Sequence, residues 1–200
     1  MKATIYRNFK NDGVKSLIVI AKEIAEGKYR SEIEYIRTLY AEGKQDEVDR
    51  CKAQLIAFAA SGTFKEQRLA SYLDEYNNFV HLDFDELTPE QLETAFKIIA
   101  DIPHTFLCFR SPRGNGIKVF VEVNTGAEHH DTAYKQVQQY YEGRVGLKSD
   151  PKCKDITRLC FMSYDPQLHK NLNNQKFIVD IPVQDQLPEQ PQLDTLQPDE

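Results

Sequence analysis

Two aspartates in one short segment carry the clearest chemical signal in the sequence. Asp83 and Asp85 lie in the run His81-Leu82-Asp83-Phe84-Asp85, and residues 79–85 alternate between apolar and polar side chains. Strict alternation predicts a β-strand, so the two carboxylates share one face and their Cα atoms lie about 6.5–7 Å apart. Carboxylates at this spacing can bridge divalent cations such as Mg²⁺, together with water and phosphate oxygens. The alternative is a pair of solvated charges.

A turn rich in small residues follows, and its residue types suit a phosphate. Residues 111–118 have the sequence Ser-Pro-Arg-Gly-Asn-Gly-Ile-Lys. Gly114 and Gly116 allow the backbone to approach a ligand closely, and exposed N–H groups in such a turn can bind an anion. Arg113 can bind a triphosphate as a fork and Lys118 as a point charge. The alternative is an ordinary hairpin turn with exposed basic side chains.

Further acidic residues come late in the chain. Residues 149–159 contain Asp150 and Asp155, and Arg158 follows them. Either carboxylate could complete a group of three metal ligands with the earlier aspartates. Each could equally cap a turn.

The hydrophobic pattern predicts the elements that must position these residues. Apolar residues at helical spacing predict helices within residues 13–57, 65–76 and 129–142. Thr88-Pro89-Glu90-Gln91 begins another helix, with a capping box and with proline at the first helical position. Besides residues 79–85, strands are predicted at residues 105–109, 117–123, 156–162 and 177–181. We therefore expect an α+β fold, with a mixed or antiparallel sheet flanked by helices.

Composition is that of an ordinary globular protein, with 40% hydrophobic and 28% charged residues. No stretch is apolar and long enough to span a membrane, and the N-terminus lacks a signal-peptide pattern. The four cysteines have no Cys-x-x-Cys spacing, so a zinc ribbon is not expected. We expect a cytoplasmic protein with reduced thiols and no membrane contact.

The net charge of −6 is concentrated in the C-terminal residues. Residues 184–200 are rich in Pro and Gln and contain five acidic residues and no Lys or Arg, which leaves −1 for residues 1–183. We expect this tail to be disordered or a linker. A near-neutral body can carry a basic patch beside an acidic metal site, so the total charge does not exclude a nucleic-acid partner.

Taken in order, the three segments resemble the archaeo-eukaryotic primase superfamily of primase–polymerase domains. Leu82-Asp83-Phe84-Asp85 is similar to its first motif, residues 111–118 to its second, and residues 149–159 to its third. The resemblance implies that Asp83, Asp85 and Asp150 are catalytic ligands of Mg²⁺ or Mn²⁺. Apart from the resemblance, His81 on the same strand face and Asp155 could support them. The resemblance also implies that nucleotide phosphates are bound by a larger set: Ser111, Arg113, Gly114, Gly116, Lys118 and Arg158.

A closer resemblance is to the VirE N-terminal domain family of Bacteroidetes and their mobile elements. It is carried by Ser61-Gly62-Thr63-Phe64, residues 81–85, residues 111–116 and residues 154–166, and it covers roughly residues 45–182. We accordingly expect a helical N-terminal segment at residues 1–44, a primase–polymerase-like domain at residues 45–183, and the tail. The resemblance also implies a helicase-like or primase-associated domain as a partner.

Two main functional hypotheses follow. The first is a metal-dependent nucleotidyltransferase of the DNA primase or polymerase type, which uses nucleoside triphosphates on single-stranded DNA or RNA during replication of a mobile element or phage. The second is a non-catalytic module of the same fold that binds a nucleotide or a single strand. Lys118 favours the second, because the primase pattern has His there and Lys does not change protonation near neutral pH. Stacking aromatics for the second would come from Tyr140, Tyr141, Phe161 and Tyr164. A two-metal nuclease is a third alternative.

Overall fold

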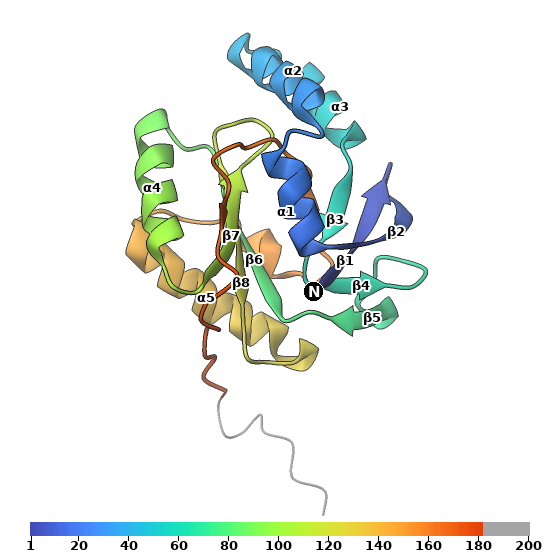
Figure 1. The fold of residues 1–200 in the computed structure, drawn as a ribbon, viewed down its shortest axis with the longest axis vertical. Helices are drawn as coiled ribbons and strands as arrows, with labels where there is room; N and C mark the ends of the chain where they lie inside the picture. Colours follow the sequence, from blue (N-terminus) through green and yellow to red (C-terminus); the bar gives the residue numbers. More distant parts are fainter. Residues whose placement is uncertain (182–200) are drawn as a thin grey trace, which may run out of the picture.

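Two antiparallel sheets organise residues 1–181, the part of the chain that the computed structural model describes (Figure 1). The first sheet has the order β2-β1-β3-β9, and the second has the order β10-β7-β8-β6. The strands of the first are β1 (Lys2–Arg7), β2 (Lys10–Ser16), β3 (Ala57–Ala59) and β9 (Leu159–Phe161). Those of the second are β6 (Phe79–Phe84), β7 (Thr105–Arg110), β8 (Ile117–Glu122) and β10 (His169–Lys170). A separate pair joins β4 (Gly62–Phe64) to β5 (Leu73–Tyr76).

Five α-helices cover these sheets within residues 1–181, so the expected α+β fold is confirmed. The helices are α1 (Leu17–Ala25), α2 (Arg30–Ala41), α3 (Gln45–Gln54), α4 (Pro89–Asp101) and α5 (His130–Val145). Helices α4 and α5 lie together on one side of the second sheet (Figure 1), where they share an apolar cluster with Val80, Leu82 and Phe84 of β6. The opposite face of that sheet shares a second cluster with α1, α2 and the first sheet. The second sheet is therefore buried on both faces. No helix among the described residues is long and apolar enough to cross a membrane.

Local sequence signals account for the elements nearest the aspartates. The alternating segment forms β6, and it pairs along its whole length with β8. Helix α4 begins at the predicted capping box, in which the Thr88 hydroxyl accepts from the Gln91 N–H at 3.3 Å and the Gln91 side chain accepts from the Thr88 N–H at 3.0 Å. The strand predictions at residues 105–109 and 117–123 and the helix at residues 129–142 are confirmed to within a few residues as β7, β8 and α5.

The N-terminal segment is not wholly helical, which corrects one expectation. Residues 1–16 form the β1–β2 hairpin, and the first helix begins at Leu17 with Ser16 as its N-cap. The helical spacing predicts one buried face made of Val14, Leu17, Ile18 and Ala21. Leu17 and Ala21 are buried as expected, together with Ile20 and Ile24, whereas Val14 and Ile18 are 53% and 38% exposed. Residues 13–16, predicted as helical, instead belong to β2, because β2 pairs with β1 and β1 also pairs with β3.

The helix predicted at residues 65–76 is wrong, and the two late strands are shorter than predicted. Residues 65–76 do not form an α-helix, because β5 pairs with β4 and is preceded by one short 3₁₀ turn at Ala70–Tyr72. Late in the chain, β9 is only three residues long, and Phe177 makes an isolated parallel bridge to Val123. The tail at residues 184–200 lies outside the described residues.

Candidate functional site

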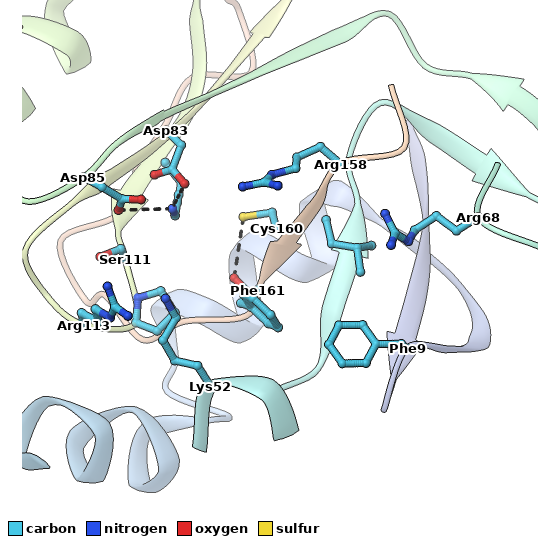
Figure 2. A pocket seen from close by; sticks show the side chains of 13 residues that line it. Phe9, Lys52, Arg68, Asp83, Asp85, Ser111, Arg113, Arg158, Cys160 and Phe161 are labelled. Carbon is cyan, nitrogen blue, oxygen red and sulfur yellow. Dashed lines mark hydrogen bonds and ion pairs between the residues drawn. The ribbon is translucent and has the colours of Figure 1, made fainter. Parts of the chain in front are cut away.

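A cleft between the two sheets gathers most of the predicted site residues (Figure 2). Its walls come from β6, β8 and the turn before β8 on one side, and from β9 on the other. Six predicted residues line it: Asp83, Asp85, Ser111, Arg113, Lys118 and Arg158. These residues come from segments up to 75 positions apart along the chain, between Asp83 and Arg158, and the sheets bring them together.

Lys118 is ion-paired with both aspartates of β6. The antiparallel register places Asp83 directly opposite Lys118 on β8. The Lys118 ammonium contacts the Asp83 carboxylate and lies 3.5 Å from Asp85 Oδ1. Asp83 and Lys118 are both buried, whereas about half of the Asp85 side chain is exposed, at 49%. Burial disfavours the charged lysine, but attraction to the two carboxylates outweighs it and raises the pKa of Lys118 above its ordinary value.

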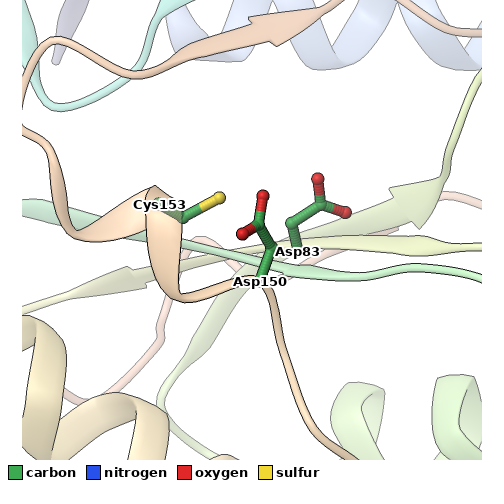
Figure 3. A group of neighbouring side chains, drawn as sticks. All are labelled: Asp83, Asp150 and Cys153. Atoms are coloured by element: carbon green, nitrogen blue, oxygen red, sulfur yellow. The ribbon is translucent and has the colours of Figure 1, made fainter.

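Asp150 places a further carboxylate beside Asp83. It lies at the start of the short 3₁₀ helix Pro151–Lys154, where its side chain accepts from the Lys152 N–H at 2.9 Å. Its backbone N–H donates to the Asp83 carbonyl at 2.8 Å, which joins this segment to β6. Side-chain atoms of Asp83, Asp150 and Cys153 all lie within 4.8 Å of one another (Figure 3). The Asp150 carboxylate also accepts from Arg158 Nη2 at 3.0 Å.

This cluster fits a divalent cation through its oxygen atoms. Asp83 Oδ1 is buried and has no hydrogen-bond partner among the described residues. A buried, unpartnered carboxylate oxygen is costly, and a hard cation such as Mg²⁺ or Mn²⁺ would satisfy it. Burial raises the pKa of the Cys153 thiol to about 12, and a hard cation prefers oxygen to sulfur, so the carboxylates are the better ligands. Asp83 and Asp150 are therefore the carboxylates that the structure brings together where a metal could bind. Asp85, expected as the third ligand, shares the Lys118 ammonium with Asp83 but lies outside this group.

The glycine turn brings its backbone against the aspartates. A Cβ atom on Gly116 would lie 2.5 Å from Asp85 Oδ1 and 2.6 Å from the Phe84 carbonyl, so only glycine fits. Gly114 adopts φ +83°, and a Cβ there would lie 3.2 Å from Arg37 Nε. Within the turn, the Ser111 N–H donates to the Gly116 carbonyl and the Gly114 N–H to the Ser111 carbonyl. These bonds shape the turn and use two of the N–H groups that an anion could otherwise bind.

Side chains are therefore the groups of the cleft that are most available to an anion. Ser111 Oγ and Arg113 Nε are buried and have no hydrogen-bond partner among residues 1–181. The other end of the Arg113 guanidinium is held by Asp49 of α3, with Nη2 to Oδ1 at 2.6 Å. Arg158 lies beside Asp150 and faces the cleft centre (Figure 2).

The sequence patterns did not identify two basic residues and one aromatic residue that line the cleft. Lys52 lies near the end of α3, and its pKa is lowered, first by burial and then by the positive charges of Arg113 and Lys118. Arg68 lies in the loop between β4 and β5 and donates to the Thr157 carbonyl at 2.8 Å. Phe9 comes from the β1–β2 hairpin. None belongs to a local motif, although Asn8 before Phe9 is a residue typical of hairpin turns.

His81 and Asp155 do not line the cleft. His81 is buried, stacks on Phe120 with ring centroids 4.8 Å apart, and has no hydrogen-bond partner for either ring nitrogen among the described residues. Burial, aided by Lys118 and Arg158, lowers the pKa of His81 to about 3, so the ring is neutral. The Asp155 carboxylate accepts from Thr157, at its N–H and its hydroxyl. It therefore shapes the turn that leads to Arg158.

The fold and the cleft together define an α+β protein with carboxylates and basic side chains facing one another between two antiparallel sheets. Residues 50–169 match the family described as BT4734-like, N-terminal domain. Since the match spans more than half of the 200 residues, the chain belongs to this family. No curated protein and no solved structure matches it significantly.

The family match corrects the identification made from the motifs. BT4734-like, N-terminal domain is a different family from the VirE N-terminal domain, so that identification is wrong. The comparisons likewise give no support to membership in the primase–polymerase superfamily. Residues 1–49, with the hairpin that carries Phe9, lie outside the match.

Proposed function

We propose that the cleft binds a nucleoside triphosphate with Mg²⁺ or Mn²⁺ and transfers its nucleotidyl group to the 3′-hydroxyl of a primer or first nucleotide, directed by a single-stranded DNA template. The observation that carries this proposal is a cleft in which Asp83 and Asp85 lie at one end, with Asp150 beside Asp83, and whose remaining charged residues are basic. Acidic residues alone would suit a simple cation site, and basic residues alone would suit an anion. Both sets side by side suit a triphosphate bound together with metal ions.

The reaction balances as a substitution at phosphorus. The 3′-oxygen forms a bond to the α-phosphorus, the bond to the bridging oxygen breaks, pyrophosphate leaves, and the hydroxyl proton passes to solvent. When bound, the metal ions would neutralise charge on the phosphates and favour the deprotonated 3′-oxygen. Little covalent chemistry falls to the protein, so its residues act by positioning and by charge.

Each group of residues has a defined part in this proposal. Asp83, Asp85 and Asp150 hold the metal. Arg113 binds the triphosphate from the glycine turn, and its guanidinium is positioned by Asp49. Arg158, held by Asp150 at 3.0 Å, binds the phosphate nearest the carboxylates. Other polar groups of the cleft contribute hydrogen bonds and positive charge: Ser111, Lys52 and Lys118.

A second candidate is supported by the position of Lys118. Its ammonium already neutralises Asp83 and Asp85, where a metal ion would otherwise do so. A cleft with this internal ion pair could bind a nucleotide or a single strand through its remaining cations and catalyse no transfer. In that case the basic residues would still bind phosphates, and Lys118 would hold the carboxylates in place.

Incorporation of labelled nucleotides on single-stranded DNA, with and without a primer, distinguishes the nucleotidyltransferase from the non-catalytic binding module. We expect product with Mg²⁺ or Mn²⁺, its loss in the Asp83→Asn/Asp85→Asn double variant, and its retention in Asp101→Asn, a control at the exposed end of α4. Thermal melting establishes that each variant is folded. A folded wild-type protein that forms no product with either metal refutes the transferase. Retained binding of nucleotide or strand would then support the second candidate.

A further inference from the structure

Phe9 is an exposed aromatic residue in a position that ordinarily suits glycine. Arg7 pairs with Lys10 across the β1–β2 hairpin, which leaves a two-residue loop of Asn8 and Phe9. Both loop residues have positive φ, at 49° and 60°. A loop of this kind favours Asn followed by Gly, because a side chain at positive φ is strained. The Phe9 side chain is nevertheless 59% exposed, so burial in the core does not explain it.

Phe9 also lies in the cleft that contains the aspartates. In this cleft (Figure 2), Asp83 and Asp85 lie at one end and Phe9 and Arg68 at the other. Phe161 lies between these ends. The hairpin is fixed relative to Phe161, because β1 pairs with β3 and β3 pairs with β9 in one sheet.

The other aromatic residues considered for stacking lie elsewhere. Tyr141 is buried and hydrogen-bonded to the Thr105 hydroxyl at 2.8 Å, and Tyr140 packs with Phe177. Tyr164 packs against Arg30 of α2. Of the four predicted stacking residues, only Phe161 lines the cleft.

We propose that Phe9, at the end of the cleft opposite the aspartates, and Phe161, between the two ends, bind an unpaired nucleobase, with Arg68 binding the adjacent phosphate or the base face. This inference rests on the proposed function, since it assumes that a nucleotide or a strand occupies the cleft. Aromatic side chains bind bases by stacking irrespective of sequence, and an arginine beside them adds a cationic contact. A strained, exposed aromatic residue at the edge of a basic cleft suits this use. The base could belong to a nucleoside triphosphate or to single-stranded DNA.

Binding measurements on the whole chain test the proposal with three probes in Mg²⁺ buffer. The probes are a fluorescent oligothymidylate, an abasic oligomer of the same length and label, and a fluorescent ATP analogue. Phe9→Ala removes the stacking surface, and Tyr35→Ala, which removes an exposed aromatic on α2 outside the cleft, is the matched control. We expect Phe9→Ala to weaken binding of at least one base-carrying probe by about tenfold or more. Phe9→Ala should bind the abasic oligomer as tightly as the wild type does. Tyr35→Ala should bind all three probes as tightly as the wild type does.

Phe9→Gly separates a role in binding from a role in folding. Glycine adopts the positive φ without strain, so this variant should unfold at a higher temperature than the wild type and yet bind the base-carrying probe more weakly. A residue with only a structural role would move stability and binding in the same direction.

Each outcome has a definite meaning. Weakened oligothymidylate binding alone assigns the base to the strand, and weakened ATP-analogue binding alone assigns it to the nucleotide. If the wild type binds the probes and Phe9→Ala binds all of them equally well, the base site is refuted while the proposed function stands. If the wild type binds neither nucleotide nor strand, the proposed function fails and this inference fails with it.

Discussion

Replacement of Lys118 by methionine tests the central feature of the cleft, its internal ion pair. The Lys118 side chain is 11% exposed and that of Asp83 is 8% exposed, so neither charge is well solvated. Methionine keeps most of the volume and removes the positive charge. Asp83 is then left buried beside Asp85, with no ammonium group between the two carboxylates.

The size of the effect follows from the cost of an uncompensated buried charge. Removal of one partner from a buried ion pair typically destabilises a protein by about 3–5 kcal/mol. Asp85 is 49% exposed and water can reach this part of the cleft, so we expect a value near the lower limit. Lys118→Met should therefore lower the free energy of unfolding by about 3 kcal/mol. The double variant Lys118→Met/Asp83→Asn should recover part of that loss, because it removes both charges.

Urea denaturation in the presence of a chelator measures these differences. Lys97→Met, an exposed lysine of α4, is the control and should stay within about 0.5 kcal/mol of the wild type. Repeating the urea denaturation with Mn²⁺ in place of the chelator tests the metal site in the same proteins. Since the ammonium no longer competes for the carboxylates, Mn²⁺ should stabilise Lys118→Met more than the wild type. If Lys118→Met is as stable as the wild type and Mn²⁺ affects both proteins equally, the reasoning about this ion pair is refuted.

Two further predictions concern the glycine turn and a buried histidine. Gly116→Ala should lower the free energy of unfolding by roughly 1–3 kcal/mol and weaken Mn²⁺ binding, because its Cβ would lie 2.5 Å from Asp85 Oδ1; urea denaturation and Mn²⁺ titration measure both effects. His130 is buried and its Nδ1 lies 2.9 Å from the Tyr76 hydroxyl, and burial lowers its pKa from 6.5 to about 4. Between about pH 4 and pH 6.5 the unfolded chain therefore binds more protons at His130 than the folded chain does. The contribution of His130 to the free energy of unfolding is complete above about pH 6.5, and about 2 kcal/mol of it is lost by about pH 5. His130→Gln should remove that part of the pH dependence in denaturation measured across this range.

Both of these predictions have direct controls. Gly143 of α5 has nothing within 4 Å of an added Cβ, so Gly143→Ala should be neutral or stabilising. A Gly116→Ala variant that behaves like Gly143→Ala would contradict the close approach to Asp85. For His130, the nearby carboxylates of Asp131 and Asp155 favour the protonated ring and act against burial. An identical pH profile for His130→Gln and the wild type would show that these carboxylates offset burial.

The accuracy of the sequence-based predictions depended on the range of the interactions involved. Strand β6 was predictable because alternation is a property of adjacent residues, and helix α4 because Thr88 and Gln91 cap it within a single turn. Residues 13–16 and 73–76 were wrongly assigned to helices because their strand partners decide their conformation. A short segment with weak preferences adopts the structure that its neighbours in space allow.

The same distinction applies to the site. The sequence by itself determined the candidate carboxylates, the glycine turn and the basic residues within it, because these are local motifs. Only the tertiary structure decided that Lys118 lies opposite Asp83, since a shift of one residue in the β6–β8 register would place its side chain on the other face of the sheet. The packing of both sheets likewise decided that Arg68 and Phe9 share a cleft with Asp83. No local pattern encodes such proximity, because it arises from hydrogen bonds and apolar contacts between segments far apart in the chain.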